Sequence, residues 1–241
     1  MVERDGQLAR EVVEDLLLPR WADQLLASQD QAASNSLKLA ASISGCAASA
    51  YLGDLTAGAV QAIQSSDERG RRELARAHQL WRLGRTGYAK SAPAEFLPPF
   101  VEAGRLFDLY GSPLVAWVRQ YEIGALFYTG DLPRALERTR ALESDSRVVH
   151  GGALWARLQW NKASINFQRA SFGDALTEYR AALAAFEATG EREHVVAMHQ
   201  SLAETYGRLG LVTEAWQQHR EALVKVSYAR DYRRIHSAIT A

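Results

Sequence analysis

The segment GDLPRAL at 130–136 returns as ASFGDAL at 170–176 and as GLVTEAW at 210–216, so each copy follows the previous one by 40 residues. In each copy a glycine or alanine opens a short turn, and an alanine follows five residues later. Each unit reads as two helical segments joined by this turn. A unit of this length cannot bury its apolar face without a stacked neighbour. The repeat predicts an all-α fold, an α-solenoid of antiparallel helix pairs, and such arrays usually bind rather than catalyse.

The composition indicates a folded chain without a nucleic-acid partner. Apolar residues make up 47% and charged residues 23% of the 241 residues, and 28 basic side chains balance 28 acidic ones. A disordered chain would be less apolar, and a nucleic-acid-binding chain would carry a basic excess. Only 6 prolines and 17 glycines interrupt a sequence dominated by Ala, Leu, Arg, Glu and Gln. This composition favours helix along almost the whole chain.

Cys46 is the single cysteine, so an internal disulfide is impossible. No basic and then apolar leader precedes the acidic residues near the start, and we therefore expect a cytoplasmic protein. The longest uncharged run, 39–53, is too short and too polar to span a membrane. Cys46 lies among small residues in this run, which favours close packing of a buried helix over a reactive nucleophile.

Glycines and capping residues divide the chain into twelve expected helices with uncertain boundaries. Pro98 and Pro99 would remove two backbone donors one turn inside a helix, so that helix should start late or kink. We expect a helical N-terminal capping region with degenerate repeats at 1–66, four repeats at 67–228 and the start of a further helix at 229–241. The expected helices span 7–28, 31–51, 54–64, 66–89, 93–110, 113–129, 132–143, 150–169, 172–188, 191–209, 211–227 and 231–240.

The last complete unit carries small and aromatic residues at the positions of a known repeat. Its pattern consists of Leu202, Ala203, Tyr206, Gly210, Ala215, Ala222 and Leu223, and the preceding unit matches through Trp160, Ala163, Phe172, Ala175, Tyr179, Ala182 and Leu183. Both units resemble the tetratricopeptide repeat (TPR), in a version with longer loops. The resemblance implies a right-handed superhelix whose first helices line a concave binding surface.

A second resemblance concerns the run from Trp21 through Gly111-Ser112-Pro113 to the segment 186–193. This run resembles TPR arrays found upstream of CHAT protease-like domains in large bacterial proteins. Such a domain would bring a catalytic Cys and His on an α/β sheet. Here the one cysteine lies in a helical pattern and no series of strands follows, so no protease activity is expected of this chain. A CHAT domain, if one exists, would lie beyond Ala241.

Helical periodicity also predicts which residues form the core. Small residues at the equivalent positions of successive units let closely crossed helices approach each other. Large apolar residues fill the space between them at i, i+3, i+4 and i+7 spacing. The expected core stripes are Leu176, Tyr179, Leu183 and Phe186 in one unit and Val212, Trp216, His219, Leu223 and Val226 in the next.

The first helices of the units carry an unusual density of aromatic and arginine residues, which often dominate binding energy at interfaces. We expect them to form a groove for an extended peptide or a helix. The alternative is that about half of the rings belong to the core. The carboxylate-clamp residues of chaperone-binding TPR domains are absent at matching positions, so capture of a C-terminal carboxylate is disfavoured. The candidate partner-binding residues are Trp81, Arg85, Tyr88, Trp117, Gln120, Tyr121, Phe127, Tyr128, Trp160, Asn161, Phe167, Gln200, Glu204 and Arg208.

Charged residues and histidines give no catalytic or metal site. Glu122 and Lys162 stand 40 residues apart, so adjacent first helices would pair them, unless both point to solvent. His194 and His199 are five residues apart and do not share the helix face that a zinc pair needs. We therefore expect no catalytic residues, no metal and no cofactor.

Three functions remain open at this point. The first is a non-catalytic scaffold or adaptor that binds a protein or peptide segment, with no nucleic acid and no membrane as partner. The second is a regulatory or sensor segment for a CHAT-type protease domain outside this chain. The third, a helical enzyme that binds a small molecule, is disfavoured because no acid, base or metal set is clustered.

Overall fold

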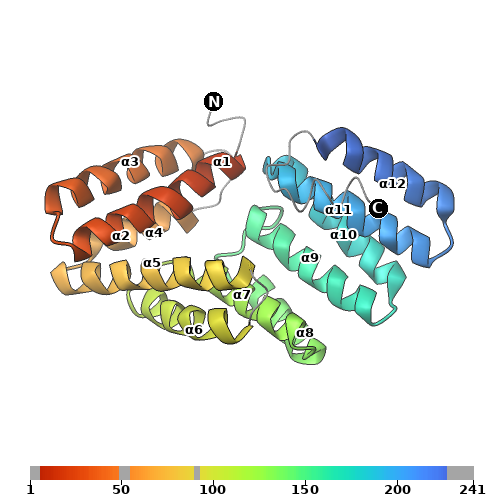
Figure 1. Cartoon of the computed structure of the whole chain (residues 1–241), viewed down its shortest axis with the longest axis horizontal. Helices are drawn as coiled ribbons and strands as arrows, with labels where there is room; N and C mark the ends of the chain where they lie inside the picture. The colour runs from red at the N-terminus through yellow and green to blue at the C-terminus, as the bar shows by residue number, and fades with distance from the viewer. Residues whose placement is uncertain (1–5, 49–54, 90–92, 227–241) are drawn as a thin grey trace. The chain divides into compact units, whose positions relative to one another are not determined.

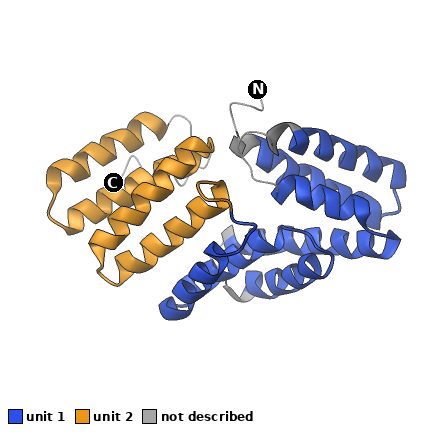
Figure 2. Ribbon diagram, turned by 180° about the vertical axis from the view of Figure 1, so that it is seen from behind, with its two compact units in different colours: residues 1–148 blue, residues 149–241 orange. Residues whose placement is uncertain are grey.

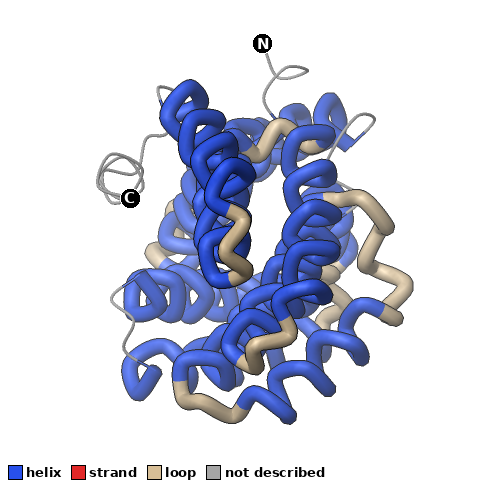
Figure 3. Tube along the Cα trace, turned by 90° about the vertical axis from the view of Figure 1, so that its right-hand side faces the viewer, coloured by secondary structure: helices blue, strands red, loops and turns tan. Residues whose placement is uncertain are grey.

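A computed structural model of the chain describes residues 6–48, 55–89 and 93–226, and every regular element among them is helical (Figures 1 and 3). The all-α prediction is confirmed for these residues. The helix expected at 231–240 and the segment 229–241 lie outside them. The helices are α1 (Gly6–Glu11), the π-helical segment η2 (Val12–Leu17), α2 (Leu18–Leu26), α3 (Asp30–Ala48), α4 (Leu55–Ser65), α5 (Glu68–Ala89), α6 (Pro93–Leu109), α7 (Val115–Tyr128), α8 (Leu132–Glu143), α9 (Ala153–Gln168), α10 (Phe172–Ala188), α11 (Arg192–Arg208) and α12 (Val212–Lys225).

The turn that defines the repeat has the same backbone geometry in all three copies. Gly130, Ala170 and Gly210 have φ angles of 80°, 59° and 74°, in the left-handed region. In each copy the N–H of the following residue donates to the carbonyl five residues before it, as the left-handed helix-ending motif requires. These bonds join Asp131 to Leu126 at 2.9 Å, Ser171 to Asn166 at 2.9 Å and Leu211 to Tyr206 at 3.0 Å. The 40-residue period is therefore a period of the backbone as well as of the sequence.

The chain divides between Val148 and Val149 into two compact units (Figure 2). Unit 1 holds α1 to α8, and unit 2 holds α9 to α12. The repeat pattern predicts a boundary between the capping region and the repeats at residues 66 and 67. Both sides of that boundary belong to unit 1, and the helices on the two sides are in contact. In particular, α2 packs on both α3 and α5, and α4 contacts α5.

Within unit 1 the helices pack on their neighbours in sequence, α5 on α6, α6 on α7 and α7 on α8. Aromatic rings fill the space between α5, α6 and α7. The Trp81 ring lies 5.6 Å from the Phe100 ring and 5.2 Å from the Tyr121 ring, and Phe96 and Phe100 are fully buried. The α5–α6–α7 layer thus has a dense aromatic core.

Pro98 and Pro99 do not delay the start of α6, which begins at Pro93 and runs through both prolines. That part of the expectation is wrong. Phe96 and Phe100 flank the two prolines and are completely buried. Burial of two aromatic side chains offsets the loss of two backbone hydrogen bonds, so packing holds the helix where local propensity opposes it.

His78 of α5 is buried between two aromatic rings. Its own ring is in edge contact with the Trp21 ring of α2 at 5.8 Å and with the Phe107 ring of α6 at 5.1 Å. Among the described residues, neither ring nitrogen has a hydrogen-bond partner. Burial lowers the pKa of His78 from 6.5 to about 3, because the charged imidazolium would lose its hydration. His78 is therefore neutral in the folded protein at neutral pH.

The depressed pKa of His78 makes the stability of the chain depend on pH. The unfolded state binds a proton below pH 6.5 while the folded state stays neutral down to about 3, so the stabilisation is complete above 6.5 and is lost as the pH falls. We expect a loss of about 2 kcal/mol between about pH 7 and about pH 5. Urea unfolding at both pH values measures this loss, with His78→Phe as the comparison. A pH dependence equal in the two proteins would contradict the assignment.

Within unit 2, α9, α10, α11 and α12 again pack on their neighbours in sequence. Leu176, Tyr179 and Phe186 are buried and Leu183 is partly buried, so the first expected core stripe is confirmed. Alanines at 163, 175 and 182 are fully buried, as the close approach of the helices requires.

The second expected core stripe, on α12, is largely exposed. Trp216 is 69% exposed, and Val212 and Leu223 are exposed as well. Only Ala215 and Ala222 of this helix are buried. The prediction was wrong for the exposed members because α12 is the last helix described, and no described helix follows to cover its second face. Periodicity identified the apolar face but not whether a neighbour covers it.

Candidate functional site

Several residues expected in a binding groove are core residues of unit 1. Trp81, Trp117 and Gln120 are 2%, 3% and 5% exposed. Trp117 also lies under the guanidinium of Arg10, at 5.0 Å from the ring centroid. Arg85 forms an ion pair with Asp15 of η2, so its charge ties α5 to the N-terminal helices. Trp81, Trp117 and Gln120 are therefore packed in unit 1, whereas Arg85 is partly exposed beside Asp15.

The remaining unit 1 candidates lie at one end of α5 and α7. The Tyr88 ring contacts the Tyr121 ring at 4.8 Å and the Tyr128 ring at 5.7 Å, and Phe127 contacts Tyr128 at 6.0 Å. Tyr128 is 49% exposed, while the other three rings are partly buried. The structure brings these four aromatics together, with Tyr128 as the accessible member.

The candidates of unit 2 are divided between core and surface. Trp160 packs edge-on against Phe186 at 6.3 Å and His194 at 5.8 Å. Asn161, Phe167 and Gln200 are partly buried, and the guanidinium of Arg208 lies 5.8 Å above the Phe167 ring. Glu204 and Arg208 are exposed and form a weak ion pair at 3.9 Å. Within unit 2 the exposed members of this set are the polar residues Glu204 and Arg208.

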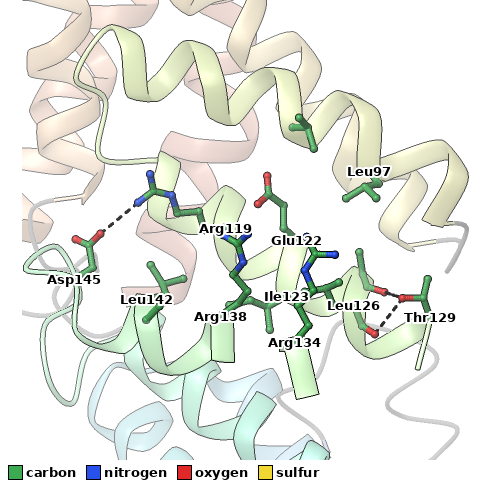
Figure 4. A pocket seen from close by; sticks show the side chains of 13 residues that line it. Leu97, Arg119, Glu122, Ile123, Leu126, Thr129, Arg134, Arg138, Leu142 and Asp145 are labelled. Atoms are coloured by element: carbon green, nitrogen blue, oxygen red, sulfur yellow. Dashed lines mark hydrogen bonds and ion pairs between the residues drawn. The ribbon is translucent and has the colours of Figure 1, made fainter. Parts of the chain in front are cut away.

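A partly open pocket of about 400 Å³ lies between α6, α7 and α8 (Figure 4). Each helix contributes residues that share one face: positions 97 and 101 of α6, positions 119, 122, 123 and 126 of α7, and positions 134, 138, 141 and 142 of α8. The lining of the pocket mixes apolar side chains with five charged ones. Its lining residues are Leu97, Val101, Arg119, Glu122, Ile123, Ala125, Leu126, Thr129, Arg134, Arg138, Ala141, Leu142 and Asp145.

Sequence reasoning identified only Glu122 among these residues, as one partner of an expected pair with Lys162. The two belong to different units, and their pairing stays a prediction; within unit 2, Lys162 lies 3.8 Å from Glu178. A signal for the pocket was present in the sequence. The α7 positions that line it mix arginine and glutamate with isoleucine and leucine at i, i+3, i+4 and i+7 spacing. A helix face that mixes charged and apolar residues in this way indicates a partly buried surface.

At one end of the pocket, Asp145 is already paired. Its carboxylate accepts hydrogen bonds from the Arg147 guanidinium at 2.8 and 2.6 Å. It also accepts one from Arg119 at 3.5 Å (Figure 4). Arg147 lowers the pKa of Asp145 to about 2, so this carboxylate is charged at neutral pH. Arg119 also contacts Asp108 at 3.4 Å. The charges at this end largely compensate one another.

At the centre of the pocket, Glu122 projects from α7 toward the space between α6 and α8 (Figure 4). Burial raises the pKa of the Glu122 carboxyl, and the positive charges of Arg119 and Arg138 oppose the rise only in part. Arg134 and Arg138 are exposed on α8, and among the described residues neither guanidinium forms a hydrogen bond or an ion pair.

Apart from its charged side chains, the pocket lining has one polar side chain, that of Thr129. Its lining includes no cysteine, histidine or serine, and its one hydroxyl, on Thr129, donates to the carbonyls of Ala125 and Leu126. Among the described residues, no three His, Cys, Asp or Glu side chains gather as a metal site requires. None of the described helices has the length and apolarity to cross a membrane.

Comparison of the chain with protein-family models and with curated proteins finds no match.

Proposed function

We propose that this chain is a non-catalytic interaction module, a TPR-like scaffold or adaptor that binds a segment of another protein. The pocket between α6, α7 and α8 is the observation that carries the proposal. It combines apolar walls with a few charged groups, as protein binding sites commonly do. A volume of about 400 Å³ admits side chains of a partner but not a whole helix.

The binding surface proposed here differs from the groove expected on the first helices. The pocket lies over α7 and between α6 and α8, which are the second helices of their pairs. Leu97 and Val101 of α6 are both exposed at its edge. An exposed apolar edge beside a pocket favours contact with an apolar side chain of a partner.

A peptide selection tests this proposal. Random peptides displayed on phage are selected against the full chain, and the affinity of each selected peptide is then measured by fluorescence anisotropy. The double variant Leu97→Glu, Val101→Glu should weaken binding about tenfold or more, because it places charge on an apolar contact. Leu109→Glu is the matched control, since Leu109 is an exposed leucine of α6 outside the pocket.

Tyr128→Ala separates the two surfaces. If Tyr128→Ala abolishes binding and the α6 double variant leaves it unchanged, the peptide binds at the aromatic residues around Tyr128. That result would contradict binding at the pocket. Failure to select any peptide that binds the chain would count against the interaction module itself. A regulatory role beside a CHAT-type domain stays a prediction from the resemblance.

A further inference from the structure

We infer that the pocket between α6, α7 and α8 recognises an acidic helical segment of a partner protein, through side-chain carboxylates that pair with Arg134 and Arg138. This inference rests on the proposed function and adds the chemistry of the occupant. It concerns carboxylates along the segment rather than a free C-terminus.

Arg134 and Arg138 form no ion pair among the described residues of unit 1. Asp145 is engaged by Arg147 and Arg119, and Arg119 in turn also contacts Asp108. Glu122 is the only other carboxylate of the lining. No hydrogen bond or ion pair joins Glu122 to Arg134 or Arg138 among the described residues. Two guanidinium groups on α8 thus remain to attract an anion.

The positions of these arginines define the spacing of the anions. Arg134 and Arg138 are four residues apart on α8, and both side chains extend from that helix toward the pocket (Figure 4). Side chains four apart on a helix lie about 5–6 Å from each other. Two carboxylates four apart on a partner helix have the same spacing, and each arginine can hold one of them through charge-assisted hydrogen bonds.

The apolar wall defines the rest of the occupant. Leu97, Val101 and Leu126 face the pocket beside the arginines. A helix with glutamates at i and i+4 and leucines at i+3 and i+7 presents both groups on one face. Its leucines would lie against the apolar wall while its carboxylates meet the arginines. A basic partner fits less well, because Asp145 already has its own cations and Glu122 is a single carboxylate beside two exposed arginines.

Three labelled helical peptides test this inference, all acetylated and amidated so that no terminal charge contributes. The first carries Glu at i and i+4 and Leu at i+3 and i+7; the second replaces each Glu by Gln, and the third by Lys. By fluorescence anisotropy we expect the Glu peptide to bind the full chain about tenfold more tightly than the Gln peptide. The Lys peptide should bind more weakly still.

Arginine variants assign the effect to the pocket. Arg138→Gln and Arg134→Gln should each weaken the Glu peptide roughly fivefold and leave the Gln peptide unchanged. Arg140→Gln is the matched control, because Arg140 is an exposed arginine of the same helix that does not line the pocket. It should leave the affinity of both peptides unchanged.

Four outcomes would overturn the inference. These are equal binding of the Glu and Gln peptides, preference for the Lys peptide, an Arg140→Gln effect as large as that of Arg138→Gln, and no binding of any of the three peptides. If phage-selected peptides still depend on Leu97 and Val101 in those cases, the interaction module stands and only the acidic occupant is wrong. If no selected peptide binds either, both proposals fail together.

Discussion

Replacing Glu191 with alanine lowers the free energy of unfolding by about 3–5 kcal/mol, the expected loss when one member of a buried charged cluster is removed. Glu191 precedes α11 and is completely buried. Its Oε2 atom lies 2.9 Å from Nδ1 of His194 and 3.7 Å from the guanidinium of Arg157. His194 is itself buried and stacks on Phe186 with ring centroids 5.0 Å apart. Without the carboxylate, the buried His194 and the partly buried Arg157 lose a partner inside unit 2.

The repeat supplies controls that isolate the side chain of Glu191 from its backbone. Ser171 and Leu211 occupy equivalent turns, with φ and ψ of −83° and 62° and of −85° and 72°, close to −79° and 64° at Glu191. Ser171→Ala and Leu211→Ala should each change the stability by less than about 1 kcal/mol. Urea denaturation of the three variants measures the comparison. A loss for Glu191→Ala no larger than that for Leu211→Ala would show that the cluster contributes little.

Local features of the sequence predicted the helices and the turns. Gly130, Ala170 and Gly210 adopt left-handed backbone at the turn that the repeated segments mark. The helix expected at 172–188 begins and ends at those residues, and the one expected at 191–209 differs by one residue at each end. Helix ends depend on a few neighbouring residues, which a single sequence displays directly. The alanines at the close contacts between helices were predictable as well, because they recur at equivalent positions of the repeat.

The surfaces could not be predicted in the same way. Trp81 and Tyr128 stand on first helices and both looked suited to a groove, yet one is buried and the other is half exposed. Trp216 carries the spacing of a core residue and is exposed. Burial depends on which helix lies opposite and how closely it approaches, and helical periodicity gives only the direction in which a side chain points. The pocket could not be predicted because its space depends on how closely three consecutive helices, α6, α7 and α8, approach one another.

Gly84→Ala is expected to destabilise the chain by about 3 kcal/mol, although alanine is the better helix former by about 1 kcal/mol. Gly84 lies inside α5 where that helix approaches α6. A Cβ atom there would come within 2.5 Å of two ring carbons of Phe100. That ring is completely buried, and Trp81, Phe96 and Tyr121 surround it at 5.6, 5.8 and 5.1 Å. The ring has no space to move into, so the helices must separate or the ring must leave its rotamer.

Two further variants make this expectation specific to the contact. Gly207→Ala adds the same methyl group inside α11, where nothing lies within 4 Å, and should stabilise the chain by about 0.5–1 kcal/mol. Phe100→Leu removes ring atoms that the new methyl group would strike, so Gly84→Ala should cost less in that background than in the natural chain. Chemical denaturation of the double-mutant set measures this coupling. If the clash with Phe100 causes the loss of stability, the smaller leucine at position 100 must reduce that loss. Equal costs of Gly84→Ala in both backgrounds would therefore mean that the Phe100 ring does not set the distance between α5 and α6.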